Sequence, residues 1–166
     1  MKQVKTISIL AVCIIAAAAV SAGTGIFSAG GPGPFAYESI RGETVTIHGY
    51  GLYKHMSADV AVQGIGQDYI TLFAAVPVLI FALVLARRGS MRGRFLLAGV
   101  LMYFFVTYLF YLVMGMYNYL FLVYVFLTGT SFFALALTLL GMDTADLASR
   151  FKEKTPVRFC GAFLLF

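Results

Sequence analysis

The side chains best suited to chemistry are collected between positions 48 and 68, which read HGYGLYKHMSADVAVQGIGQD. This stretch holds both histidines of the chain, His48 and His55, together with the carboxylates of Asp59 and Asp68. Imidazole and carboxylate groups are ligands that zinc accepts, and His55 and Asp59 have the one-turn spacing of a helix. His48, His55 and Asp59 are therefore the candidates for a metal site. Because the sequence has no H-E-x-x-H motif, we predict no metal and no cofactor.

The sequence around this stretch is apolar and defines the class of protein. Hydrophobic residues make up 61% of the chain and charged residues only 11%, against about 25% charged residues in a soluble domain. Four stretches approach the 20 or so apolar residues that cross a bilayer, and they contain no Asp, Glu, Lys, Arg or His. We predict an all-α membrane protein, a single membrane domain over 1–166 with a four-helix transmembrane bundle. The predicted spans are 7–27, 69–86, 95–116 and 119–141.

A further apolar run begins near Val157 and reaches Phe166. As a helix it would cover only about 15 Å, half of a bilayer crossing. It either lies at the membrane interface or is the first part of a fifth helix that continues beyond the sequence, and we favour the second. The prediction therefore includes a partial fifth apolar segment over 157–166.

The basic residues predict the orientation, because loops rich in Lys and Arg stay cytoplasmic. Alternating spans put ten of the twelve basic residues on one side and leave Arg41 and Lys54 on the other. The ten are Lys2, Lys5, Arg87, Arg88, Arg92, Arg94, Arg150, Lys152, Lys154 and Arg158. We therefore expect a cell membrane protein with a cytoplasmic N-terminus and an extracytoplasmic loop over 28–68. This topology and the lipid bilayer account for the net charge of +5, and no nucleic-acid partner is expected.

The first span also resembles a secretory signal peptide, with a small-residue region at Val20-Ser21-Ala22. However, its apolar stretch continues to Phe27, and Ala17, Ser21 and Gly25 repeat at four-residue spacing. A face of small residues lets another helix approach closely in lipid. We interpret the segment as a retained, packed helix.

Two features within the spans concern helix shape and helix packing: a proline in the second span and a polar stripe in the third. Pro77 removes a backbone donor, so a bend near Phe73 is predicted. Tyr103, Thr107 and Tyr111 form one stripe of the third span, which predicts either interhelical hydrogen bonds or the wall of a pocket.

The 28–68 loop is predicted to be a small cap on the bundle. Its Gly- and Pro-rich start predicts turns, and residues 44–49 alternate as in a strand or hairpin. Ser57 would cap a short helix that ends at Gly64 and Gly66, before Asp68 at the start of the second span.

Spans free of ionisable residues argue against a coupled transporter. Cys13 and Cys160 both fall in apolar runs and no C-x-x-C is present, so thiol chemistry is not predicted either.

The stretches GYGLY, GQDYITL, ARRGSMRGR and YNYLFLVYV resemble a group of uncharacterised polytopic membrane proteins from prokaryotes, over roughly residues 35 to 140. The resemblance implies further helices and no activity. This chain has Lys54-His55-Met56 after GLY, where that group carries a charged or polar stretch, so a histidine-based site does not transfer.

The leading functional hypothesis is a non-enzymatic binding or accessory protein that uses its outer cap and helix ends to bind a protein partner or a small apolar ligand. The alternatives are a channel or transporter component and a membrane-embedded metal-dependent enzyme. The candidate binding residues are Tyr50, Tyr53, His55, Asp59, Asp68, Tyr103 and Tyr111.

Overall fold

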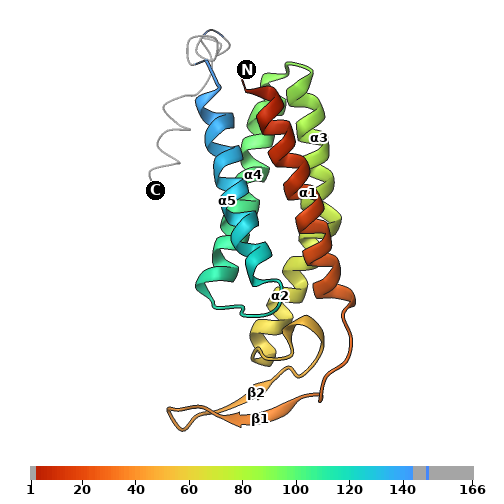
Figure 1. Cartoon of the computed structure of the whole chain (residues 1–166), viewed down its shortest axis with the longest axis vertical. Helices are drawn as coiled ribbons and strands as arrows, with labels where there is room; N and C mark the ends of the chain where they lie inside the picture. The colour runs from red at the N-terminus through yellow and green to blue at the C-terminus, as the bar shows by residue number, and fades with distance from the viewer. Residues whose placement is uncertain (1–2, 144–148, 150–166) are drawn as a thin grey trace, which may run out of the picture.

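The protein is an all-α bundle with a small two-stranded sheet at one end (Figure 1). The computed structural model describes residues 3–143 and 149. Within them, four helices are long and apolar enough to cross a membrane: Val4–Phe27, Ala58–Arg87, Met91–Val113 and Phe121–Leu140. The predicted fold class is confirmed for this part of the chain. The predicted partial segment 157–166 lies outside the described residues.

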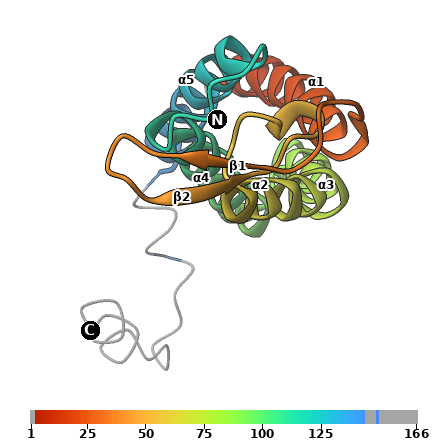
Figure 2. The ribbon, with the colours of Figure 1, turned by 90° about the horizontal axis from the view of Figure 1, so that it is seen from below.

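The four helices form a ring in which each lies between two neighbours. α1 (Val4–Phe27) packs against α5 (Phe121–Leu140) on one side and α3 (Val76–Arg87) on the other. α4 (Met91–Val113) closes the ring between α3 and α5, and the view along the bundle shows this order (Figure 2). α4 and α5 are antiparallel neighbours, and their connection, 114–120, is longer than the two residues left between the predicted spans 95–116 and 119–141.

The two ends of the bundle differ in composition. The N-terminus of the chain, the α3–α4 turn and the end of α5 lie at one end, which we call the basic end (Figure 1). Residues 28–57 lie at the other and form the cap. The described cations of the basic end are Lys5, Arg87, Arg88, Arg92 and Arg94.

The second spanning helix is longer than predicted and runs without a break over Ala58–Arg87. The predicted stop at Gly64 and Gly66 was wrong, and the helix that contains the predicted span 69–86 begins at Ala58. Gly64 has a packing role instead: an added Cβ would come within 3.0 Å of Cε1 in the Tyr53 ring. The glycine therefore makes room for an aromatic side chain within a continuing helix.

This longer helix changes where the ionisable residues lie. A helix of 30 residues is about 45 Å long, more than the hydrocarbon core of about 30 Å. Asp68 lies about 29 Å from Arg87 along this axis, near the cap-side boundary of such a core. Its side chain is 1% exposed. The predicted span 69–86 itself contains no carboxylate, but the helix that carries it holds Asp68 directly before that span.

A π-helical turn, η2 (Thr71–Ala75), separates α2 (Ala58–Ile70) from α3. It ends just before Pro77, which has no amide hydrogen for the regular ladder. π turns and prolines are the usual causes of a change in helix direction. The π turn lies where a bend was predicted, near Phe73. Beyond it α3 packs closely on α4, whereas α2 is not among the close neighbours of α4.

The cap combines a hairpin with one 3₁₀ turn. Strands β1 (Phe35–Glu38) and β2 (Thr44–Ile47) pair antiparallel, with Phe35 opposite Ile47, and lie beyond the helix ends (Figure 1). The alternation of residues 44–49 predicted β2. The Gly- and Pro-rich start of the 28–68 loop predicted only turns, so β1 was not predicted. The 3₁₀ turn η1 (Gly51–Tyr53) carries two buried side chains, Leu52 and Tyr53, which join the core of the bundle.

Candidate functional site

The centre of the candidate site is Asp68, a carboxylate held by hydroxyls from two other elements. Oδ2 of Asp68 accepts a 2.6 Å hydrogen bond from the Tyr53 hydroxyl in η1. The Tyr111 hydroxyl, on α4, lies 3.2 Å from both Asp68 Oδ1 and the Gly64 carbonyl, and shares its one proton between them. We call Tyr53, Asp68 and Tyr111 the Asp68 clasp, because they join the cap, α2 and α4.

Gly25 on α1 supplies the space for this carboxylate. A Cβ added at Gly25 would lie 1.7 Å from Asp68 Oδ2 and 3.3 Å from Cε2 of Tyr53. The small-residue face predicted for the first helix is therefore real at this position, since Ser21 and Gly25 are buried. At Gly25 this face allows α1 to approach the Asp68 side chain closely, in addition to packing against other helices.

The Tyr53 phenol is well suited to act as a donor. Burial raises the pKa of Tyr53 far above its ordinary value of 10.0, and the neighbouring Tyr111 and Asp68 raise it further. The phenol therefore stays neutral and keeps its proton available to Asp68.

Two buried tyrosines fix the position of Tyr111. Its ring centroid lies 5.6 Å from that of Tyr108 and 5.1 Å from that of Tyr124, both in edge-on contacts. Tyr108 and Tyr124 stack on each other at 5.9 Å. Edge-on and offset-stacked contacts are the favourable arrangements of aromatic rings, so Tyr111 is held in one orientation.

A second group of polar side chains lies next to the clasp and bridges α2 and α4. Gln67 Nε2 donates to the Tyr103 hydroxyl at 2.6 Å and lies 3.4 Å from Thr107 Oγ1. The hydroxyls of Thr71 and Tyr103 are 2.9 Å apart. Interhelical hydrogen bonds of this kind contribute roughly 0.6 kcal/mol each in a membrane. They connect helices whose backbones are not closely packed here.

The space between α2 and α4 is a cavity of about 300 Å³, which we call the lateral cavity. Its polar lining includes Gln67, Tyr103, Thr107 and Tyr111. Its apolar lining is Val106, Phe110, Met114 and Met116. Phe110 is 57% exposed on the outer surface of the bundle, so the cavity opens sideways. Both predictions for the tyrosine stripe of the third span are confirmed: it makes interhelical hydrogen bonds and it lines a pocket.

The structure brings together four of the seven predicted binding residues. Tyr53, Asp68 and Tyr111 form the clasp, and Tyr103 lines the adjoining cavity. The other three do not join them. Tyr50 is exposed and contacts His48 edge-on at 5.8 Å, His55 lines a different cleft, and Asp59 is exposed in the first turn of α2.

Among the described residues, no three His, Cys, Asp or Glu side chains are placed to hold a metal ion together. The zinc alternative built on His48, His55 and Asp59 therefore has no geometric support.

Sequence reasoning gave Gln67 no hydrogen-bond partner and did not include Thr71 or Gly25 in the site. Gln67 and Thr71 lie one turn apart on the second helix, so they present one polar stripe toward the stripe of α4. This stripe was not recognised from the sequence because the helix was expected to end at Gly64 and Gly66.

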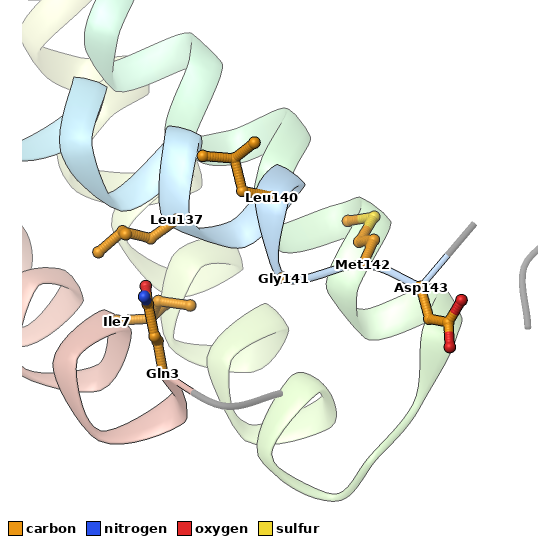
Figure 3. A pocket seen from close by; sticks show the side chains of 7 residues that line it. All are labelled: Gln3, Ile7, Leu137, Leu140, Gly141, Met142 and Asp143. Carbon is orange, nitrogen blue, oxygen red and sulfur yellow. The ribbon is translucent and has the colours of Figure 1, made fainter. Parts of the chain in front are cut away.

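A separate hollow of about 450 Å³ lies at the basic end, between the start of α1 and the end of α5 (Figure 3). Gln3 and Ile7 border it on one side, and Leu137 and Leu140 on the other. Asp143, the last residue of the continuous described segment, also lines it.

Comparison of the chain with protein-family models, with curated proteins and with solved structures gave no match. The resemblance to prokaryotic polytopic membrane proteins stays a prediction from sequence.

Proposed function

We propose that the protein is a non-enzymatic binding protein of a membrane, whose lateral cavity takes a small, mostly apolar ligand with one hydrogen-bonding group. The observation that carries this proposal is the lining of the cavity, in which the polar group of Gln67, Tyr103 and Thr107 adjoins an apolar wall. Ligand sites typically combine an apolar lining with a few placed polar groups, and about 300 Å³ is at the small end of their range.

The position of the cavity supports a ligand that arrives through lipid. Phe110 and Met114 line it and are both exposed on the surface of α4. An apolar molecule dissolved in the bilayer would reach Gln67 and Tyr103 without crossing the cap. Its polar group would then replace the hydrogen bond that these two side chains make with each other.

Binding of 1-naphthol to the protein in nanodiscs tests the proposal, since this probe is apolar, fluorescent and carries one hydroxyl. We expect saturable binding above that of empty nanodiscs, and loss of it in Val106→Phe, which fills the cavity. Val113→Phe is the matched control, because Val113 is an exposed valine of the same helix outside the cavity lining. Gln67→Leu should weaken binding by roughly two- to tenfold, the effect of one hydrogen bond. Equal binding by wild type and Val106→Phe would refute the proposal.

The distribution of basic residues is also the basis for the proposed orientation of the protein in the membrane. The described cations Lys5, Arg87 and Arg88 lie at the basic end together with the α3–α4 turn, which supports a cytoplasmic basic end and an extracytoplasmic cap in a prokaryotic cell membrane. In a variant without native cysteines, Ile40→Cys in the fully exposed hairpin tip should react with an impermeant maleimide in intact cells. Arg88→Cys should not react, and the reverse pattern would overturn the orientation.

A second candidate function is a subunit of a channel or transporter. The observation that favours it is a buried carboxylate, Asp68, in a helix that contains a π turn and Pro77. Buried ionisable residues and irregular helices mark ion pathways in membrane proteins. Proton flux into proteoliposomes, followed with internal pyranine, should then be lost in Asp68→Asn. Absence of any flux that depends on Asp68 would remove this candidate.

A further inference from the structure

A further cavity lies at the cap end, between η1 and the α4–α5 connection. This cap cleft has a volume of about 650 Å³ and is formed by η1 and the residue pair Lys54 and His55 on one side. The α4–α5 connection and the first turn of α5 form the other side, with Tyr117, Tyr119 and Phe121. Among its lining residues there are two basic side chains and no carboxylate.

The floor of the cap cleft is held firmly against α1. The amide of Gly51 donates to the Gly30 carbonyl at 2.8 Å, and the amide of Leu52 donates to Ser28 Oγ at 2.7 Å. Gly51 has a φ of +57°, and a Cβ there would lie 2.5 Å from the Ser28 carbonyl oxygen. Lys54 therefore projects from a turn whose backbone is fixed, next to a rigid helix end.

An apolar groove of about 460 Å³ continues along the neighbouring helices. It runs between α1 and α5, and its α1 wall is made of Ala16, Ala17 and Val20. Its α5 wall is Leu122, Val123 and Phe126. The two alanines leave the space that larger side chains would fill. We call this the α1–α5 groove.

Leu122 lines both the cap cleft and the α1–α5 groove, so the two cavities are adjacent at the start of α5. Together they form a basic, aromatic mouth at the helix end followed by an apolar channel between two spanning helices. This is the shape and polarity of one phospholipid, with a head group at the interface and an acyl chain along the helices.

We propose that the cap cleft and the α1–α5 groove bind an anionic phospholipid. Lys54 faces the phosphate, Tyr117 and Tyr119 lie at head-group level, and one acyl chain fills the groove beside Val20. The basic lining without a carboxylate selects an anionic head group over a zwitterionic one, because each lysine near such a surface gains attraction to anionic lipid. This site is independent of the lateral cavity, with which it shares no lining residue.

The proposal is tested by native mass spectrometry of the full chain, released from micelles that contain equal amounts of phosphatidylglycerol and phosphatidylcholine. Wild type should retain one phosphatidylglycerol in preference to phosphatidylcholine. Lys54→Ala should reduce this retention by about fivefold, at the upper end for one exposed charge. Arg41→Ala is the matched control, since Arg41 is an exposed cation of the cap outside the cleft lining.

The groove is tested separately by Val20→Phe, which fills it and should lower retention of both lipids. Val12→Phe should have no effect, because Val12 is an exposed valine of α1 outside the groove lining.

Glycerol 3-phosphate, the free head group, should not compete, because the acyl chain supplies much of the binding. Equal retention of the two lipids, or retention unchanged in both Lys54→Ala and Val20→Phe, would overturn the proposal. Val106→Phe should leave lipid retention intact, so failure of this site and failure of the lateral cavity are distinguishable.

Discussion

The hydroxyl of Tyr53 and the carboxylate of Asp68 lie 2.6 Å apart, although they belong to a 3₁₀ turn of the cap and to a membrane-length helix. Both side chains are 1% exposed. Hydrogen bonds to carboxylates are stronger than those between neutral groups, and a buried carboxylate without a donor is costly. The contact therefore fixes the cap on the bundle.

The first prediction concerns removal of this carboxylate. Asp68→Ala leaves the Tyr53 hydroxyl buried without its acceptor and opens a small cavity, so we expect the free energy of unfolding to fall by about 3 kcal/mol. Asp68→Asn keeps an acceptor oxygen and should cost about half as much. Thermal unfolding in detergent measures both effects.

Tyr53→Phe should lower the free energy of unfolding by about 1.5–3 kcal/mol, the range for a hydrogen bond to a charged group. Tyr69→Phe is the matched control, because Tyr69 is a neighbouring tyrosine with a half-exposed side chain. Equal effects of these two substitutions would show that the Tyr53 hydroxyl contributes nothing to stability.

The helices of this fold could be predicted from sequence because each is signalled locally. Runs of apolar residues marked the four spans, and the four-residue spacing of Tyr103, Thr107 and Tyr111 marked a face that turned out to be bonded and to line a cavity. Such signals need only the period of a helix.

The clasp could not be predicted in the same way, because its contacts join residues far apart in the chain. Tyr53 is 15 positions from Asp68, and Tyr111 is 43 positions from it. Gly64 was interpreted as a helix end on local grounds, whereas its missing side chain is explained by the Tyr53 ring, which only the fold brings there. Long-range packing thus overrides the local meaning of a glycine.

The second prediction uses two glycines of α1 that differ only in their surroundings. Gly25→Ala would place a methyl group 1.7 Å from Asp68 Oδ2, so Asp68 or the helix must move. We expect a loss of at least about 2 kcal/mol in the free energy of unfolding, as for overpacking of a core. The same substitution should also lower the protection of Tyr53 and its neighbours in hydrogen exchange.

Gly23→Ala is the control, because a Cβ at Gly23 meets nothing within 4 Å. It should be neutral or stabilise by up to about 1 kcal/mol through helix propensity. If Gly25→Ala behaved like Gly23→Ala, the close approach of α1 to Asp68 would be contradicted.

The third prediction concerns alkaline pH. Because burial raises the pKa of Tyr53 above its ordinary value of 10.0, the folded protein keeps the proton while the unfolded chain releases it above pH 10. The unfolded state then binds fewer protons, so the stability contributed by Tyr53 is fully present below pH 10 and is lost as the pH rises further. The loss should approach about 1.4 kcal/mol per pH unit for this one group.

The measurement is the difference in free energy of unfolding between wild type and Tyr53→Phe, which should shrink as the pH rises above 10. Tyr50→Phe, at an exposed tyrosine of the same cap, should show a constant difference. A wild-type advantage over Tyr53→Phe that does not change with pH would contradict the burial of this phenol.

The fourth prediction is that the cap is a docked structure and exchanges its amides accordingly. The amide of His48 donates to the Met56 carbonyl at 2.9 Å, and the amides of Gly51 and Leu52 donate to the segment that follows α1. With Leu52 and Tyr53 buried in the core, these amides can exchange only when the cap opens. In nanodiscs, residues 48–56 should therefore exchange much more slowly than the exposed residues 29–31.

Tyr53→Phe should accelerate exchange over 48–56 and leave the middle of α4 unchanged, since the lost bond belongs to the cap. Equally fast exchange over 29–56 in wild type would mean that the cap is a loose connection, and would remove the fixed position of Lys54 on which the phospholipid site depends.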